Sequence, residues 1–325
     1  MSDIFIISWL QDALRNLSDI FNIALLQNTL RTATPIILAG LGCLFTDQVG
    51  IMNIGIDGMM LVGAFVAVAV SFFMGSWLAG LMAAILAGLL LGLFYGVFVI
   101  RFKSDEFIIG VALNIFAGAV IVFLLRTIFG VKGAFSSSQI VPLPRLDWSF
   151  LQSIPLLGPL LNQNTLLVYV SWLFVLLCWL FLYKTPRGFW MRAAGQHPES
   201  LRSAGISPER MKYEASLICG VFSGIAGAHL SLGYLNMFTE NMSASRGFIA
   251  VACVIFGASN PPFVFLAALL FGFIDALGLR LQYVGVSSNL TAMSPYLVTV
   301  IMLVLLSLRK QRVRRALPSG LPPKG

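Results

Sequence analysis

The sequence predicts an all-α polytopic membrane protein with about 8–10 transmembrane helices, because it is strongly apolar and contains many long apolar runs. It is 58% hydrophobic and only 10% charged, whereas soluble domains carry about 25% charged residues. A spanning helix needs roughly 20 mostly apolar residues. We expect spans at 22–46, 51–73, 77–100, 107–129, 164–183, 213–235, 262–281 and 294–308, with a short apolar piece at 247–257 that belongs to a broken span.

Charged residues separate one membrane domain, residues 22–308, from two flanking segments. Residues 1–21 carry leucines at helical spacing beside charged side chains, which indicates an interfacial amphipathic helix. Residues 309–325 form a basic tail, and further basic residues gather at 101–103 and in the loop 184–212. The positive-inside rule places all three basic clusters in the cytoplasm. The net charge of +8 therefore reflects membrane topology, and we expect no nucleic-acid partner.

Three stripes of small residues recur at every fourth position and predict close helix packing. They comprise Gly80, Ala84, Gly88, Gly92 and Gly96; Gly220, Gly224 and Ala228; and Ala268, Gly272 and Ala276. The block 58–67 precedes the first stripe and the similar block 247–257 precedes the last, in opposite directions across the membrane. This similarity between the two segments predicts an inverted internal repeat. In transporters, such a repeat places the substrate pathway near the interface between the repeats.

Several polar residues interrupt the apolar spans and mark a candidate pathway. The segment 47–58 contains two carboxylates, an asparagine and three glycines, which favours an unwound or re-entrant stretch over a straight helix. The candidate substrate-pathway residues are Asn53, Asp57, Asn114, Arg246, Phe248 and Asp275. Their hydrogen-bonding groups suit a polyhydroxylated ligand. The alternative is that they only tie helices together, and the sequence leaves both interpretations open.

The loop 184–214 concentrates charge between two apolar spans and carries helix signals of its own. The run 185–188 (Thr-Pro-Arg-Gly) breaks the incoming span, and 197–199 (His-Pro-Glu) starts a short helix with Pro at its first position. Gly205 ends that helix. The run 207–209 (Ser-Pro-Glu) starts another, which continues into the next span. A short helix joined rigidly to a span is able to transmit a push.

Three motifs resemble one known family. The run 192–206 looks like the coupling-helix loop of ABC importer permeases, in the branch that carries simple sugars and nucleosides. The runs 49–60 and 246–257 resemble the early and late signatures of that branch. Two features depart from the pattern: Asp57 stands where the family more commonly has Glu, and His229 has no place in it. The amino-acid sequence of the early signature favours the nucleoside-type subgroup.

The resemblance implies a type II ABC importer-like permease subunit in the bacterial cytoplasmic (inner) membrane. It implies as partners a second like or related permease, two cytosolic ATPase domains and an extracytoplasmic binding protein. The sequence contains no G-x-x-x-x-G-K-[ST] motif, so partner subunits must use the ATP and the chain itself is expected to bind no cofactor. The implied ATPase-coupling residues are Arg192, Gly195, Gln196, His197, Pro198, Glu199, Arg202, Ala204 and Gly205.

Three other functional classes remain as alternatives to this one. A branched-chain amino-acid permease of the same superfamily is the nearest alternative. An ion-coupled secondary transporter would use Asp57 or Asp275 as its coupling site, but it leaves the capped cytosolic helix without a role. An enzyme is not expected, because the sequence shows no catalytic set of residues, and its four cysteines lie in apolar spans without metal-type spacing.

Overall fold

The computed structural model describes residues 22–147 and 162–283 and, with gaps, residues 287–304. Within this part of the chain, seven helices are long and apolar enough to cross a membrane, which confirms the polytopic all-α fold. The predicted segments 1–21 and 309–325 lie outside the described residues.

Between residues 22 and 147, the chain forms four long helices whose ends follow local sequence signals. The elements are α2 (Ile23–Gln48), α3 (Ile56–Met74), α4 (Trp77–Gly96) with its π-helical continuation η1 (Val97–Arg101), and α5 (Glu106–Phe129). The side chains of Asn22, Ser76 and Asp105 cap α2, α4 and α5 by accepting backbone N–H groups. Gly75 and Gly130 end α3 and α5 in the left-handed conformation.

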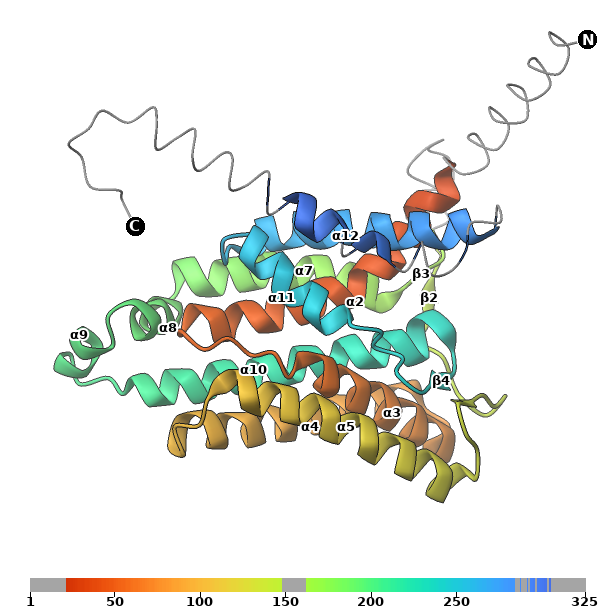
Figure 1. The fold of residues 1–325 in the computed structure, drawn as a ribbon, viewed down its shortest axis with the longest axis horizontal. Coiled ribbons are helices and arrows are strands. Elements are labelled where there is room, and N and C mark those ends of the chain that lie inside the picture. The colour runs from red at the N-terminus through yellow and green to blue at the C-terminus, as the bar shows by residue number, and fades with distance from the viewer. Residues whose placement is uncertain are drawn as a thin grey trace, which may run out of the picture.

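The second half alternates long and short helices. The helices are α7 (Leu166–Lys184), α8 (Pro186–Gln196), α9 (Pro198–Ser203), α10 (Pro208–Ala228) with its π-helical continuation η3 (His229–Leu235), α11 (Arg246–Phe256) and α12 (Pro261–Tyr283). Two short antiparallel pairs join β1 (Ala134–Phe135) to β4 (Phe238–Thr239) and β2 (Arg145–Leu146) to β3 (Asn164–Thr165). Figure 1 shows α9 at one end of the helical layers and these strands at the other.

The predicted small-residue stripes lie where helices cross most closely. The stripe of α4 faces that of α10, and a Cβ added to Gly88 would overlap the carbonyl oxygen of Gly220. The stripe of α12 faces α2, where a Cβ on Gly272 would lie 2.7 Å from the backbone of Ala33. The absence of side chains at these positions lets the backbones approach. The prediction of helix packing is therefore confirmed.

Two helices begin inside the protein, next to non-helical segments. The expected span 51–73 is wrong at its start, because α3 begins only at Ile56 and residues 49–55 are not helical. Gly50 has a φ of 75° and turns the chain away from α2. Residues 240–245 likewise lead into the buried start of α11, the short helix that was expected to be part of a broken span.

Candidate functional site

The charged loop 184–214 contains two short helices where the sequence predicts one over 192–206. Thr185 ends α7 and also caps α8, because its hydroxyl accepts a hydrogen bond of 3.2 Å from the N–H of Gly188. Pro186 fits the first position of α8. Thr185 and Pro186 thus both end α7 and begin α8, whereas the sequence predicts only the end of α7. Of the predicted coupling residues, Arg192, Gly195 and Gln196 lie at the end of α8, and His197 separates α8 from α9.

The short helix α9 has the predicted start and end. Pro198 occupies its first position and Glu199 its first turn. Ala204 follows its last residue, and Gly205 then turns the chain with a φ of 78°. Leu201 is buried beneath the helix, which holds α9 against the rest of the protein.

Arg202 joins α9 to the start of α10. Its guanidinium donates to Glu199 at 2.7 Å and also to Glu209. Its hydrogen bond to Glu209 and the charge of Glu199 raise the pKa of the Arg202 guanidinium above its usual value. Ser207 caps α10 by accepting from the N–H of Arg210 at 3.3 Å. The ion pairs and the cap make α9 and the first turn of α10 one connected unit.

The end of α8 packs backbone to backbone against the turn after α2. A Cβ on Gly195 would overlap the carbonyl oxygen of Gln48 and would lie 3.0 Å from the nitrogen of Gly50. Nearby, Arg192 stacks over the ring of Tyr183, with 4.7 Å between the guanidinium carbon and the ring centroid. The loop therefore contacts the non-helical segment 49–55 directly.

A groove of about 550 Å³ separates this loop from the turn between η1 and α5. Its walls carry both signs of charge, including Lys103, Glu106, Glu199, Arg202 and Lys212. Two of the three basic clusters that the positive-inside rule assigns to the cytoplasm, 101–103 and 184–212, border this groove. The groove lies at the end of the molecule that carries α9.

Asn53 and Asn114 hold the non-helical segment in place. The buried Asn53 accepts from the N–H of Gly55 at 2.9 Å, and its amide points to the sulfur of Cys219. Asn114, on α5, accepts from the N–H of Gly58 at 2.7 Å and donates to the carbonyl of Ile54 at 3.0 Å. These bonds satisfy backbone groups that a continuous helix would have paired. Contact of either asparagine with a transported molecule stays a prediction.

Asp57 connects the starts of the two interior helices. It lies in the first turn of α3 rather than in the non-helical segment. One carboxylate oxygen accepts from the hydroxyl of Ser243 at 2.9 Å and the other from the N–H of Gly247 at 3.0 Å. Gly247 belongs to the first turn of α11, where a negative charge is favourable. Asp57 thus anchors α11 to α3.

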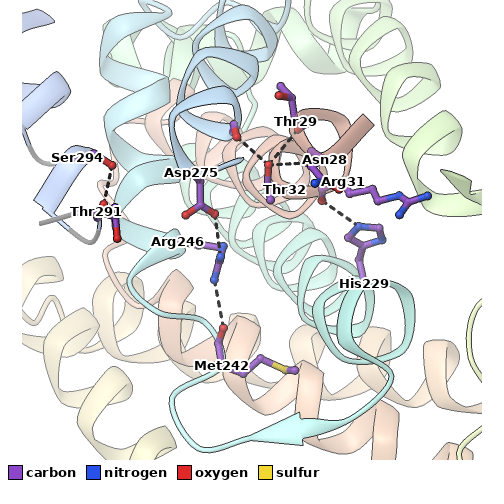
Figure 2. Close-up of polar contacts among 11 residues, drawn as sticks. Asn28, Thr29, Arg31, Thr32, His229, Met242, Arg246, Asp275, Thr291 and Ser294 are labelled. Carbon is purple, nitrogen blue, oxygen red and sulfur yellow. Dashed lines mark hydrogen bonds and ion pairs between the residues drawn. The ribbon is translucent and has the colours of Figure 1, made fainter. Parts of the chain in front are cut away.

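Arg246 and Asp275 form an ion pair between α11 and α12. The closest atoms, Nη2 and Oδ2, are 2.9 Å apart, and the side chains are 16% and 26% exposed. Figure 2 shows the two side chains pointing toward one another, with Thr291 to one side. The pair lines a cavity of about 250 Å³. Phe248, two residues after Arg246 in α11, is exposed and is not among the residues that line this cavity.

His229 lies on the opposite side of α2 from this ion pair (Figure 2). It is fully buried, 3.4 Å from the carbonyl oxygen of Arg31 and 3.5 Å from the hydroxyl of Thr165. Thr32, the residue after Arg31 in α2, donates to the carbonyl of Gly272 at 2.8 Å. Both polar groups tie helices together.

Four residues of these sites escaped the sequence analysis. Gly50 meets Gly195, Ser243 binds Asp57, and Gln282 and Thr291 line the cavity, where Gln282 donates to Thr291 at 2.6 Å. A glycine turn and isolated polar residues near span ends carry no spacing signal. Only the fold brings them to their partners.

Seven apolar spans among the described residues, two interior helix starts and a cavity lined by an ion pair define a multi-pass membrane protein. The chain belongs to the family described as branched-chain amino acid transport system / permease component, whose model matches residues 25–307. It is therefore a transport subunit of the cytoplasmic membrane and works with partner components, not as an enzyme, as the sequence predicts.

The relatives cover nearly the whole chain. A putative glucose ABC transporter permease, TsgC13 of Haloferax volcanii, is 33% identical over 89% of this chain and 93% of its own length. The guanosine ABC transporter permease NupQ of Bacillus subtilis is 32% identical over 83% and 88%. The nucleoside ABC transporter permease NupC of Lactococcus lactis is 30% identical over 84% and 89%. No solved structure matches the chain.

Proposed function

We propose that the chain is one permease subunit of an ATP-driven ABC importer that moves a nucleoside or a simple sugar into the cytoplasm. The observation that carries the proposal is its similarity, over more than four fifths of the chain, to permeases named for guanosine, nucleosides and glucose. The capped α8–α9–α10 loop at one end supports an ATP-driven system, because a gradient-driven transporter has no use for such an element.

Cytosolic ATPase domains are the proposed partners of the α9 end. The chain has no P-loop motif of its own, so its energy must come from other subunits. The groove beside α9, with charges of both signs, offers them a polar docking surface. A second permease completes the proposed membrane part, and an extracytoplasmic binding protein would deliver substrate at the strand end.

Access would alternate through a rearrangement between two halves of the chain. The block 58–67 follows Asp57 and the block 247–257 begins at Gly247, and the bond between these two residues lies where the halves meet. The inverted repeat itself stays a prediction. Under this proposal, a push on the loop shifts the start of α3 relative to α11 and thereby opens one side of the membrane or the other.

The substrate and the energy source are tested together in proteoliposomes. The complete transporter, reconstituted with its ATPase and binding protein, is given labelled guanosine, glucose or leucine, with ATP inside the vesicles or with an ion gradient alone. We expect ATP-dependent uptake of guanosine or glucose. The family description favours a second candidate, a branched-chain amino acid, and ATP-dependent uptake of leucine alone would establish it. Uptake driven by an ion gradient without ATP would contradict the ABC mechanism.

The coupling role of the loop is tested by Arg202→Glu. The substitution places three carboxylates together, so we expect α9 to separate from α10 and ATP hydrolysis to continue without uptake. Arg210→Glu is the matched control: it makes the same charge change on an exposed arginine, for which the described residues show no ion pair. Uptake per ATP that stays at the parent level in Arg202→Glu would refute the assignment.

A further inference from the structure

The cavity beside the ion pair combines charged and neutral hydrogen-bonding groups within apolar helices. Its walls include Arg246 and Asp275. Gln282 and Thr291 also line it, closer to the end of the molecule that carries the short strands. Gly278 and Leu279 of α12 also line it, together with Ala244, Ile249 and Pro295. Polar groups that converge on one cavity in a membrane protein mark a binding site.

The ion pair retains unused hydrogen-bonding capacity. A guanidinium has five N–H donors. Apart from the bond to Asp275, Arg246 makes only a long contact of 3.5 Å to the carbonyl of Met242, and its buried Nε has no partner among the described residues. Asp275 accepts from Arg246 through Oδ2 alone, as far as the described residues show. Arg246 therefore has hydrogen-bond donors, and Asp275 has an acceptor oxygen, that could still bind a ligand.

We propose that this pair binds two adjacent hydroxyl groups of the substrate's sugar ring. One hydroxyl donates to the carboxylate of Asp275, and its neighbour accepts from the guanidinium of Arg246. Adjacent ring hydroxyls lie about one hydrogen-bond length apart, which matches the 2.9 Å between Nη2 and Oδ2. The inference rests on the proposed function, and it names the group that nucleosides and simple sugars share.

A neutral diol fits the site better than an amino acid does. Arg246 and Asp275 already neutralise each other, so a diol adds hydrogen bonds without separating the two charges. A zwitterion would have to pull the ion pair apart inside a low-dielectric region, which is costly. Gln282 and Thr291 extend the site with neutral partners only.

The size of the cavity suits a sugar ring. Its volume of about 250 Å³ corresponds to roughly eight water molecules at ~30 Å³ each. A pentose or hexose ring with its hydroxyls is of this size, whereas a purine nucleoside has about twice as many non-hydrogen atoms as ribose. The base of a nucleoside would therefore stay outside the cavity. The site would recognise the sugar and accept nucleosides with different bases.

The test compares guanosine with 2′,3′-dideoxyguanosine, which lacks the two hydroxyls. Uptake of both labelled compounds is measured with the complete transporter, in the parent and in Asp275→Asn. The binding protein is the same in both, so its own preference cancels when the two uptake ratios are compared. We expect the preference for guanosine to fall on the order of tenfold in the variant, because hydrogen bonds to charged groups are lost.

Further variants separate binding from structural support. Arg246→Lys keeps the charge but loses the planar guanidinium group. It should therefore also lower the ratio of guanosine uptake to dideoxyguanosine uptake. The double exchange Arg246→Asp with Asp275→Arg restores the ion pair in reverse. A purely structural pair would recover the parent ratio in that exchange, which would overturn the proposal. Arg126→Gln, which removes an exposed arginine from the last turn of α5, serves as the control.

Two other results would overturn the inference. One is an unchanged guanosine preference in both Asp275→Asn and Arg246→Lys, and the other is competition by leucine that disappears in Asp275→Asn. In either case the ATP-dependent uptake of guanosine by the parent would leave the proposed function intact. Absence of guanosine and glucose uptake in the parent would instead refute the proposed function.

Discussion

Gly195→Ala tests whether the loop acts on the membrane part through its contact with the turn after α2. The added Cβ would overlap the carbonyl oxygen of Gln48 and lie 3.0 Å from both the carbonyl carbon of Val49 and the nitrogen of Gly50. All three are backbone atoms, so no flexible side chain can give way. To regain an ordinary contact of 3.4 Å, the two segments must separate by about an ångström at the carbonyl oxygen of Gln48 and by several tenths of an ångström at the other two atoms.

The expected energy is modest, and the expected functional effect is larger. Overpacking costs about 1–3 kcal/mol, and the gain in helix propensity from Gly to Ala offsets about 1 kcal/mol. The net loss of stability is therefore between about 0 and 2 kcal/mol, too little to prevent folding. Under the proposed coupling, however, a displaced turn would change where α8 transmits its push, so uptake per ATP hydrolysed should fall.

Gly118→Ala is the matched control for this experiment. Gly118 also lies in a helix, but a Cβ there would meet nothing within 4 Å. It should therefore leave uptake per ATP unchanged and raise thermal stability slightly, because Ala has the higher helix propensity. The assay measures ATP hydrolysis and labelled guanosine uptake on the same proteoliposomes. If Gly195→Ala transports as much substrate per ATP as Gly118→Ala, the contact with Gly50 carries no coupling and the reasoning is wrong.

Two further substitutions test the packing and the anchor. Gly88→Ala should lower the thermal midpoint of the detergent-solubilised protein well below that of Gly118→Ala, since its Cβ would overlap the backbone of Gly220; equal midpoints would contradict the close crossing. Asp57→Ala leaves the N–H of Gly247 without its acceptor, so its midpoint should fall below that of Asp57→Asn, which keeps a carbonyl oxygen there. The opposite order would exclude a hydrogen-bonding role.

Periodic and capping signals were sufficient to predict most of the helices. The stripe through Gly88 has a four-residue spacing within a long apolar run, and in a membrane-spanning helix this spacing gathers the small residues on one face. Ser207 and Pro208 predict the start of α10 for an equally local reason: an oxygen to cap the first N–H groups and a ring that fits the first turn. Signals of this kind depend on neighbours in sequence.

The sites needed the fold because their partners are far apart in the chain. Ser243 binds Asp57 across 186 positions, and no pattern in either segment predicts that contact. The start of α8 was missed for a different reason, since Thr185 and Pro186 are both a break and a cap. The loop was correctly predicted as a distinct element, but the contact of Gly195 with Gly50 appeared only in the structure.

The contacts form a short connection from the loop to the proposed sugar site. Gly195 touches Gly50 backbone to backbone, and the segment that begins at Gly50 ends at the start of α3, where Asp57 anchors the first turn of α11. Arg246 lies in that same turn. Under the proposed function, a movement of α8 would displace the guanidinium relative to Asp275 on α12, unless the anchor yields first. We infer that the ion pair keeps one geometry as long as the loop does not move. The movement of the loop that opens the pathway would then also weaken the binding of the sugar by Arg246 and Asp275.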